Sequence, residues 1–403
     1  MKITKAVILA AGEGSRMRPL TYTRPKVMLP LVNKPILEHL LLEMRQAEIR
    51  DFIFIVGYRD EQIRNYFEDG ANWGVRIQYA NQRKQLGTAD ALRMVKDMVE
   101  ERFLLANGDI IIGSGDIQRL KEQTGNAVSA IELENVAGLG VIESCDGQVV
   151  HIYEKMAEPP SHLANAGLYL FTQDIFEAID NTQKSLRGEF EITDSIRILI
   201  ENGQSVTCHV IDQWLDISYP WDLLEVNEQI MQSLESKNFG EIEDRVTIKG
   251  SVSIGKGTVI RSGAYIVGPV IIGENCDIGP NCFIRASTAI GDNCHIGAAV
   301  EVKNSIVMSG TKIPHLNYVG DSVLGERCNL GAGTKIANLR LNKKNIMING
   351  LDTGRKKLGA IFGDHVETGI NSSINVGAMI GNDTFIGPGA LVYGNISPDS
   401  KLL

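Results

Sequence analysis

The sequence predicts two architectures in succession, an α/β domain followed by a parallel β-helix. Up to about Leu234, apolar strand-like segments alternate with amphipathic helix-like segments, which indicates a Rossmann-like domain with a mostly parallel sheet. After Arg245, aliphatic residues recur at every sixth position. The chain has 403 residues, enough for two or three domains, and we expect domains at 1–235 and 236–403.

The first domain alternates short strands with amphipathic helices. Strands are expected at 5–11, 51–57, 75–80, 102–106, 127–131 and 167–171, and helices at 35–48, 60–67, 89–98 and 221–234. The polar stretch 235–245 is predicted to be a linker. Because parallel sheets bind ligands at the carboxyl ends of their strands, the loop after the first strand is a candidate ligand site.

The second domain is predicted from its hexapeptide repeat. Three hexads form one triangular coil, so residues eighteen apart should stack at roughly 4.8 Å. Small residues stand four positions after the aliphatic ones. The repeat breaks between about 305 and 318, resumes, breaks again and returns at Ile374. The inward aliphatic positions of the first run are Ile254, Ile260, Ile266, Ile272, Ile278, Ile284, Ile290, Ile296 and Val302.

Composition excludes several classes of partner. The formal net charge of −9 argues against a nucleic-acid or anionic-membrane partner, and no stretch is apolar and long enough to span a membrane, so we expect a cytoplasmic protein. The 6 cysteines form no CxxC pair, which argues against a zinc knuckle. Cys276, Cys282 and Cys294 occupy the small inward position of the repeat, where free cysteine acts as a compact hydrophobe. A metal site on that ladder is the disfavoured alternative.

A glycine-rich loop after the first strand predicts a polyphosphate site. The loop runs from Leu9 to Pro19 and is followed by the segment from Arg24 to Pro30. Its glycines allow close approach of the backbone to a ligand, and Arg16 and Lys26 place positive charge beside it. A GxG alone would be a weak signal, since glycines mark many ordinary turns.

The whole pattern LAAGxGSRMRPLTxxxPKxxxP resembles the sugar-1-phosphate nucleotidylyltransferase family, and the resemblance extends over the first 235 residues. It implies a nucleotide site at Ala10, Gly12, Gly14, Gln82, Gly87 and Thr88. It implies a sugar pocket at Gly140, Glu154 and Asn165, with Lys155 beside Glu154. It implies Mg²⁺ ligands at Asp109, within Asn-Gly-Asp, and at Asp216, within Trp-Leu-Asp.

The implied chemistry explains these residue types. The phosphate of a sugar 1-phosphate attacks the α-phosphorus of a nucleoside triphosphate, and pyrophosphate leaves in line. The nucleophile is already an anion, so catalysis consists mostly of positioning and charge neutralisation. Arg16 would hold the β- and γ-phosphates, and Lys26 would contact the α-phosphate and the attacking phosphate. Two carboxylates suit the oxygen preference of Mg²⁺.

Each of these residues also has a plain structural interpretation. Asp109 could simply form a turn, and Asp216 could cap a helix before Tyr219-Pro220. Glu154 could be half of a solvated strand pair with Lys155. The arginines that we interpret as solvated or supporting, with no role in the site, are Arg18, Arg24 and Arg83.

A second site is predicted on the coils. Arg285 and Lys303 are eighteen residues apart, so they should stack on successive coils. Two cations at roughly 5 Å repel each other unless an anion bridges them or their side chains splay apart. The repeat breaks just after Lys303, which predicts a loop that leaves the coil and carries the stretch 314–321.

These residues resemble the acetyltransferase half of the bacterial bifunctional N-acetylglucosamine-1-phosphate uridylyltransferase/glucosamine-1-phosphate acetyltransferase family. The match runs through Arg285, residues 300–303, residues 315–321 and the stretch Asn-Leu-Gly-Ala-Gly-Thr at 329–334. It implies that His315 takes the proton from a sugar amine that attacks acetyl-CoA, a task that suits an imidazole. Arg285 and Lys303 would hold the sugar phosphate. Sugar-positioning residues would be Tyr318, Asn329 and Asn338, and Ala332 would face the CoA.

The resemblance also implies a left-handed coil, a homotrimer and two activities. We expect acetyl-CoA-dependent N-acetylation of glucosamine 1-phosphate, followed by Mg²⁺-dependent transfer of UMP from UTP to N-acetylglucosamine 1-phosphate. One alternative is a glucose-1-phosphate thymidylyltransferase or mannose-1-phosphate guanylyltransferase with a structural β-helix. Another is a non-catalytic regulatory subunit, which is disfavoured because Arg16, Lys26 and Asp109 are all present.

Two features depart from the bacterial pattern. The stretches RPLTYTRPK and WLDISYPWD look closer to glucose-1-phosphate thymidylyltransferases, so we expect either UTP or dTTP as the nucleotide and the motifs do not choose between them. The segment 341–358 is longer than the loop of the family. Its basic residues 355–357 could meet the CoA phosphates or could form a solvated loop.

Overall fold

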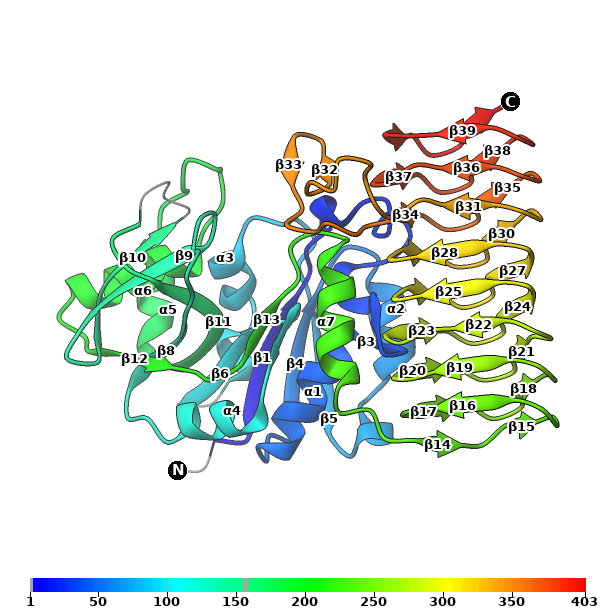
Figure 1. The fold of residues 1–403 in the computed structure, drawn as a ribbon. Helices are drawn as coiled ribbons and strands as arrows, with labels where there is room; N and C mark the ends of the chain where they lie inside the picture. Colours follow the sequence, from blue (N-terminus) through cyan, green and yellow to red (C-terminus); the bar gives the residue numbers. More distant parts are fainter. Residues whose placement is uncertain (1–2, 100, 155–158) are drawn as a thin grey trace. The chain divides into compact units, whose positions relative to one another are not determined.

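A computed structural model describes residues 3–99, 101–154 and 159–403. The internal contacts divide the chain into two compact units (Figure 1). The first unit comprises 1–13, 25–28 and 36–216, and the second comprises 14–24, 29–35 and 217–403. Two short segments of the N-terminal signature therefore belong to the same unit as the C-terminal half. The two compact units interleave along the N-terminal part of the chain, so they do not test a boundary at 235/236. The expected division into domains 1–235 and 236–403 stays a prediction.

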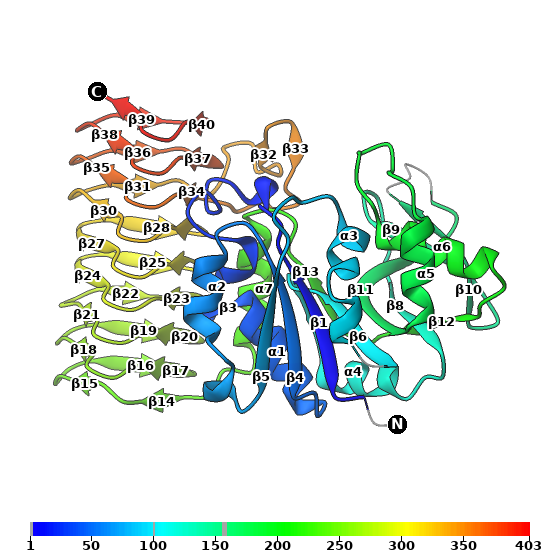
Figure 2. The same ribbon diagram turned by 180° about the vertical axis from the view of Figure 1, so that it is seen from behind.

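The first unit is built on a nine-stranded mixed sheet (Figure 2). The strands β5, β4, β1 and β6 run parallel, as predicted, whereas the other half of the sheet mixes both directions. In spatial order the strands are β5 (Arg76–Asn81), β4 (Asp51–Val56), β1 (Lys5–Ala10), β6 (Arg102–Asn107), β11 (Leu163–Thr172), β8 (Asn126–Glu132), β12 (Val206–Val210), β10 (Gln148–Glu154) and β9 (Gly140–Cys145). The small sheet β7 (Ile110–Ile112) and β13 (Trp214–Asp216) is antiparallel.

Helices cover both faces of this sheet because β1 is apolar on both sides. Ile8 packs with α1 (Ile36–Gln46), α2 (Asp60–Phe67) and α4 (Ser114–Lys121), and Val7 packs with the helices of the opposite face. That opposite layer consists of α3 (Thr88–Arg93), α5 (Asp174–Asn181) and α6 (Ile192–Glu201). The 3-10 turns are η1 (Ser15–Met17), η2 (Lys26–Met28), η3 (Ala71–Trp73) and η4 (Lys96–Met98).

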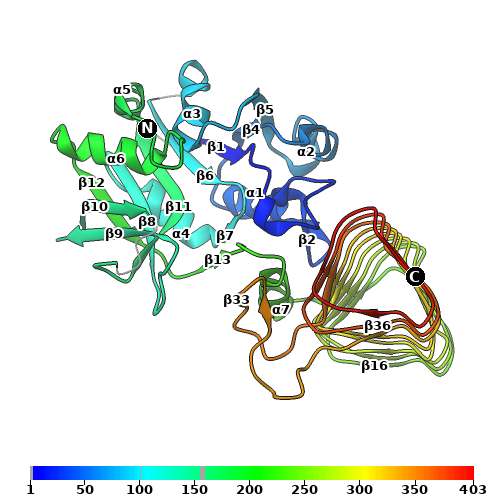
Figure 3. The same cartoon turned by 90° about the horizontal axis from the view of Figure 1, so that it is seen from above.

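The second unit is the left-handed parallel β-helix that the sequence predicts, and Figure 3 shows its triangular cross-section. Its first face consists of β14 (Lys237–Asn238), β17 (Val252–Ile254), β20 (Val270–Ile272), β23 (Thr288–Ile290), β26 (Ile306–Val307), β29 (Val323–Leu324), β34 (Ala360–Phe362), β37 (Ala378–Ile380) and β40 (Asn395–Ile396). The second face consists of β15 (Glu241–Ile242), β18 (Val259–Ile260), β21 (Asp277–Ile278), β24 (His295–Ala298), β27 (Lys312–His315), β30 (Asn329–Leu330), β35 (Glu367–Thr368), β38 (Phe385–Ile386) and β41 (Lys401–Leu402). The third face consists of β16 (Thr247–Lys249), β19 (Tyr265–Val267), β22 (Phe283–Ile284), β25 (Glu301–Lys303), β28 (Tyr318–Gly320), β31 (Lys335–Ile336), β36 (Ser373–Ile374) and β39 (Leu391–Val392). The unit also contains α7 (Asp222–Met231) and the strand pair β2 (Pro30–Leu31) and β3 (Lys34–Pro35).

The repeat positions lie where the sequence places them. Every predicted aliphatic position from Ile254 to Val302 is at most 2% exposed, and Val252 stacks on Val270 eighteen residues later. Cys276, Cys282 and Cys294 are buried in the same apolar column, as predicted for compact hydrophobes.

Two expectations about the coil are wrong. The polar stretch 235–245 is not a linker, because its backbone forms β14 and β15 and pairs with the next coil even though its side chains are exposed. No loop leaves the coil after Lys303. Instead, Val302 stacks on Val319, so that coil is one residue shorter at the corner and the hexad continues in a shifted phase. The excursion lies between β31 and β34 and carries the hairpin of β32 (Met347–Ile348) and β33 (Leu351–Asp352). No helix in the described ranges is long and apolar enough to cross a membrane.

The burial of the thiols predicts how they react. Cys145 is exposed, whereas the other five cysteines are buried, and burial raises the pKa of Cys282 to about 11 and that of Cys328 to about 12. A thiol must be deprotonated to react. We therefore expect the native protein at pH 8 to react with one equivalent of a thiol reagent, measured by absorbance, and the variant Cys145→Ser to react with none. Rapid reaction of more than one thiol would contradict the buried column.

Candidate active sites

The end of β1 forms one side of the nucleotide candidate in the first unit. The carbonyl of Ala11 accepts hydrogen bonds from the backbone N–H of Tyr58 at 3.1 Å and from Nε2 of Gln85 at 3.3 Å. The Cα of Gly12 faces open space, since a Cβ atom there would meet nothing within 4 Å. The backbone beyond Ala10 is therefore open to a ligand, as the predicted role of Gly12 requires.

The segment from Gln82 to Thr88 lies beside this loop. A Cβ atom at Gly57 would touch both the carbonyl of Gln82, at 2.9 Å, and Cβ of Ala11, at 3.1 Å. Nε2 of Gln82 donates to the carbonyl of Gly87 at 3.2 Å and to Oδ2 of Asp90 at 3.0 Å. Gly87 has a φ of 114° and lies against the backbone of Phe190, so a side chain could not replace it. The structure thus brings together Ala10, Gly12, Gln82, Gly87 and Thr88, whereas Asp90 is a neighbour that the sequence analysis missed.

The remaining signature residues, Gly14 and Arg16, belong to the second unit. Gly14 adopts a left-handed φ of 63°, and its carbonyl accepts the hydroxyl of Thr21 at 2.8 Å. The guanidinium of Arg16 lies 5.8 Å from the ring of Tyr219, which stacks on Trp221 at 4.8 Å. These groups line a pocket of about 410 Å³, together with residues of the β32–β33 hairpin and the last coils.

The metal candidates lie at the junction of β6 and β7. Nζ of Lys26 is 2.6 Å from Oδ2 of Asp109, and the two side chains are 12% and 33% exposed. Gly108 precedes Asp109 in a position that only glycine fits, since a Cβ atom would lie 2.8 Å from the carbonyl of Leu9. Asp216 pairs in register with Ile110 and so comes next to Asp109.

The donor set fits Mg²⁺. Two carboxylates on paired strand ends offer hard oxygen ligands, and Lys26 already occupies a cation position beside Asp109. Within the described residues no group of three or more His, Cys, Asp or Glu side chains could hold a metal. The helix-cap alternative for Asp216 is wrong, because Asp216 ends β13 and the N-cap position of α7 is Trp221.

The sugar candidates meet at one end of β9, β10 and β11. A Cβ atom on Gly140 would be 3.4 Å from Oε1 of Glu154 and 3.8 Å from Nδ2 of Asn165. Nδ2 of Asn165 donates to the hydroxyl of Tyr169 at 2.8 Å, and Oε1 of Glu154 accepts the hydroxyl of Thr193 at 3.0 Å. Glu154 therefore has polar partners on α6, where the alternative of a simple strand pair expects none. Lys155 lies outside the described residues.

The coil candidates gather on the third face. Arg285 directly follows β22 and lies in register with Lys303 of β25 on the next coil, as the spacing of eighteen predicts. The two cations do not share an anion here, because Arg285 pairs with Glu301 at 2.8 Å and Lys303 pairs with Asp321 at 3.0 Å. The side chains of Lys303 and Asp321 are only 17% and 3% exposed. The cations therefore splay toward separate carboxylates, each of which a phosphate could displace.

Tyr318 and Asn338 complete this cluster. Nδ2 of Asn338 contacts both the hydroxyl of Tyr318, at 3.2 Å, and Oδ2 of Asp321. Burial and the carboxylates of Asp321 and Glu301 raise the pKa of Tyr318, so the phenol keeps its proton near neutral pH. In the sequence, Asp321 stands out only as the last residue of the stretch 314–321. The structure makes it the shared partner of Lys303, Asn338 and Asn304.

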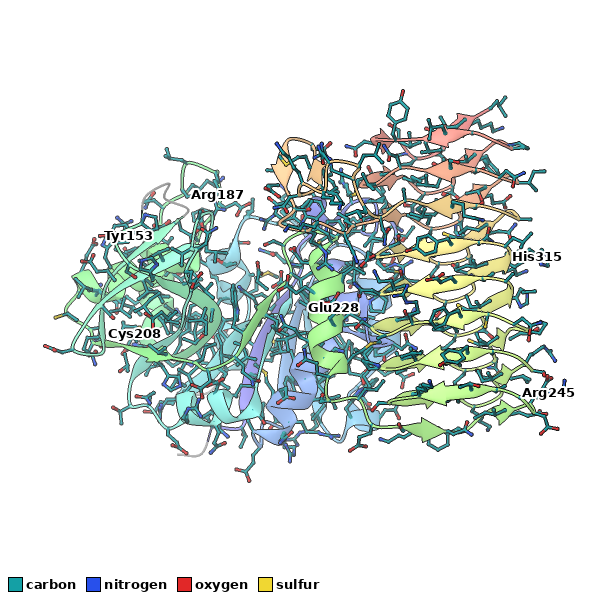
Figure 4. The ribbon with its side chains drawn as sticks, in the orientation of Figure 1. Tyr153, Arg187, Cys208, Glu228, Arg245 and His315 are labelled. Atoms are coloured by element: carbon teal, nitrogen blue, oxygen red, sulfur yellow. The ribbon has the colours of Figure 1, made fainter. Side chains whose placement is uncertain are left out.

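His315 lies at the corner between the second and third faces. Figure 4 shows it at the outer edge of the coil with its side chain pointing away from the apolar column. Its carbonyl accepts the backbone N–H of Gly333 at 3.1 Å, so His315 stacks beside Ala332 of the next coil. Asn329 is exposed at the start of β30, opposite Lys312 and at the other end of the second face. A single chain therefore brings His315 together with Ala332, but places Asn329 apart from both.

The arginines that were assigned no site role differ from one another. Arg83 is exposed, as predicted, and Arg18 is exposed above the ring of Tyr22 at 5.0 Å. Arg24 is only 5% exposed and ion-paired, so it is supporting but not solvated. In the excursion, Arg355 pairs at 3.3 Å with Glu228, which Figure 4 labels on α7. Lys356 and Lys357 are exposed.

Comparisons with known proteins match both halves. The family described as nucleotidyl transferase matches residues 5–233, and the GMPPB C-terminal domain matches residues 266–375. The "bifunctional protein GlmU" of Methanococcus maripaludis strain C7 is 43% identical over 401 residues, which cover 98% of this chain and 96% of that protein.

The chain belongs to the bifunctional sugar-1-phosphate nucleotidylyltransferase/acetyltransferase family. The protein of Sulfurisphaera tokodaii that carries this name is 40% identical over 400 residues, with 96% of this chain and 97% of that protein covered. As a member of the bifunctional family, the chain is an enzyme of nucleotidyl and acetyl transfer, which excludes the non-catalytic alternative.

A solved structure supports the fold of part of this bifunctional enzyme. It is named as a glucose-1-phosphate thymidylyltransferase from Bacillus anthracis in complex with a sucrose, and it has a TM-score of 0.53 at 28% identity. The match covers 97% of that protein but 58% of this chain. That protein therefore has no counterpart for a large part of the bifunctional chain.

The pair of Lys26 and Asp109 gives a direct test of the nucleotidyl site. We expect Lys26→Met to lower pyrophosphate release by about 10²–10³-fold, because it removes a positioned charge on the transferring phosphoryl group. Acetyl transfer, measured by thiol release in the same preparation, should stay near normal. The control is Lys96→Met, whose ammonium faces Asp180 at 3.6 Å with half of the side chain exposed. Unchanged pyrophosphate release would remove Lys26 from the site.

Proposed function

We propose that the first half of the enzyme transfers UMP from UTP to N-acetylglucosamine 1-phosphate, giving UDP-N-acetylglucosamine and pyrophosphate. We propose that the coil makes that sugar phosphate by transferring an acetyl group from acetyl-CoA to glucosamine 1-phosphate. Residues 1–235 would carry the first activity and residues 236–403 the second. The observation that carries the proposal is the cluster of Lys303, Asp321, Asn338 and Tyr318, since a purely structural coil needs no sheltered polar set on one face.

In the nucleotidyl step, an oxygen of the sugar phosphate attacks the α-phosphorus, and the bond to the pyrophosphate oxygen breaks. Lys26 is sheltered and held beside Asp109, so its positive charge is positioned to neutralise the α-phosphate. Arg16 holds the β- and γ-phosphates of the leaving group. Asp109 and Asp216 would hold Mg²⁺, which supplies further neutralisation of the triphosphate when bound.

The sugar of this step would be held at the end of β9, β10 and β11. Glu154 and Asn165 offer an acceptor and a donor to the hydroxyls of the sugar, while Gly140 leaves room beside them. Thr193 and Arg187 orient Glu154. This division keeps the anionic end of the sugar phosphate near Lys26 and its neutral ring near amide and carboxylate groups.

In the acetyl step, the amine attacks the thioester carbon, the carbon–sulfur bond breaks, and the thiol of CoA leaves. His315 takes a proton from the attacking amine, while Lys303 and Arg285 hold the phosphate. Asp321 keeps Lys303 in place until a phosphate arrives. Asn329 lies away from His315 in the single chain. We propose a homotrimer in which a neighbouring chain completes this site, and a cytoplasmic location.

A second candidate concerns the nucleotide. The solved relative is named as a thymidylyltransferase, and the sequence carries motifs of that kind. We therefore keep dTTP beside UTP as a substrate of the first half, and glucose 1-phosphate as its sugar acceptor.

A substrate panel tests the assignment. Glucosamine, N-acetylglucosamine, glucose and mannose 1-phosphates are each combined with UTP, dTTP or GTP, with and without acetyl-CoA. We expect thiol release only with glucosamine 1-phosphate and acetyl-CoA, and pyrophosphate release with UTP and N-acetylglucosamine 1-phosphate. Absence of thiol release with any amino-sugar phosphate would reduce the coil to a scaffold.

His315 gives a test of the two-site assignment. We expect His315→Ala to lower thiol release by roughly 10²–10⁴-fold, because general base catalysis contributes that much. Pyrophosphate release should stay near normal. The matched control is His365→Ala, since His365 is an exposed histidine that pairs with Asp383 elsewhere on the coil. Equal loss of both activities in His315→Ala would contradict two separate sites.

A further inference from the structure

The coil holds two segments of the nucleotide signature at one of its corners. Within the second unit, Nδ2 of Asn33 donates to the carbonyl of Ile290 at 2.7 Å. Nη1 of Arg24 donates to Sδ of Met308 at 3.3 Å and to Oε1 of Glu326 at 2.9 Å, and Nη2 donates to Oδ2 of Asp364 at 2.5 Å. These acceptors end or follow β23, β26, β29 and β34, which are successive strands of the first face. The segments 14–24 and 29–35 are therefore fixed across four consecutive coils.

The centre of this contact is a buried ion pair. Arg24 is 5% exposed and the side chain of Asp364 is 4% exposed. Asp364 is fully used, since Oδ2 also accepts the hydroxyl of Thr23 at 2.6 Å and Oδ1 accepts the backbone N–H of Glu326 at 2.8 Å. Loss of either partner leaves an uncompensated buried charge. A lysine could not replace the planar guanidinium fully, because Arg24 reaches acceptors in two directions at once.

The segment that Arg24 fixes is the one that carries Arg16. Both residues lie within 14–24, which belongs to the second unit as a single piece. The hydrogen bond from Thr21 to the carbonyl of Gly14 closes this piece into a compact turn, and Met17 and Leu20 are each 1% exposed. A displacement of Arg24 is therefore transmitted to the turn from which Arg16 projects.

We propose that Arg24 is a positioning residue for nucleotidyl transfer that acts through the turn carrying Arg16. The pair of Arg24 with Asp364 holds this turn in the conformation that the contact of Arg16 with the triphosphate requires. The inference rests on the role proposed above for Arg16. Asp364, which lies 340 residues after Arg24 in the sequence, thereby gains a function in nucleotidyl transfer without contacting the substrates.

The test compares both activities in full-length variants. We expect Arg24→Met and Asp364→Asn each to lower kcat/KM for the nucleoside triphosphate by roughly 10–100-fold, the effect of a misplacement of about 1 Å. Acetyl transfer should change less than twofold, and Arg24→Lys should recover part of the loss. The matched control is Asp383→Asn, which makes the same change in an exposed carboxylate of the same β-helix.

Two double variants test the mechanism. If Arg24 acts through Asp364, the losses of Arg24→Met and Asp364→Leu should not add in the double variant. If Arg24 acts through Arg16, Arg24→Met should have no further effect in an Arg16→Met background. Additive losses in both backgrounds would overturn the proposal, as would parallel loss of both activities. Normal pyrophosphate release in Arg16→Met would instead refute the proposed role of Arg16.

A milder variant covers the case in which the buried pair is needed for folding. Glu326 is 43% exposed, so Glu326→Gln removes one partner of Arg24 without burying an unpaired charge. We expect a loss of about twofold to fivefold in kcat/KM for the triphosphate, with an unchanged melting temperature and unchanged acetyl transfer. An unchanged kcat/KM in Glu326→Gln, together with an unfolded Arg24→Met, would assign the pair to stability alone and overturn the proposal.

Discussion

The hydrogen-bond ladder between successive coils is the constraint on which the second unit depends. Each coil repeats its three short strands against the coil before it, and one aliphatic column fills the interior. The ladder fixes the position of every residue along the axis of the β-helix. The sequence separation between two polar residues at a corner therefore determines whether they lie beside each other on successive coils. The cluster around Lys303 and the contacts of Arg24 both arise in this way, at two different corners of the β-helix.

The strongly periodic parts of the fold could be predicted from the sequence. The α2 helix and the inward hexad positions lie where expected, because their patterns depend on local spacing. The coil after Lys303 could not be predicted, since the loss of one residue at a corner shifts the phase and looks like a break. The first coil was missed for the opposite reason. Most of its side chains are polar or exposed, and it joins the β-helix mainly through backbone pairing.

The same distinction applies to the sites. Motifs indicated Lys26, Asp109 and His315 because each lies in a recognisable local sequence. The partners Asp90, Thr193 and Asp364 are remote in sequence from the residues that they contact, so no local pattern could reveal them. For this reason the sequence indicated only a solvated or supporting role for Arg24. A single arginine in a loop carries no sign that its acceptors come from coils more than 280 residues later.

The polar first coil also has a consequence for self-association. A column of parallel strands exposes a row of unpaired backbone groups at its end, and such an edge can pair with the edge of another molecule. The strands at this end are two or three residues long and carry the exposed charges of Lys237, Glu241 and Lys249. Short, charged edge strands disfavour end-to-end stacking of columns into fibres. The residues that hide the repeat from a sequence search thus serve as a barrier against polymerisation.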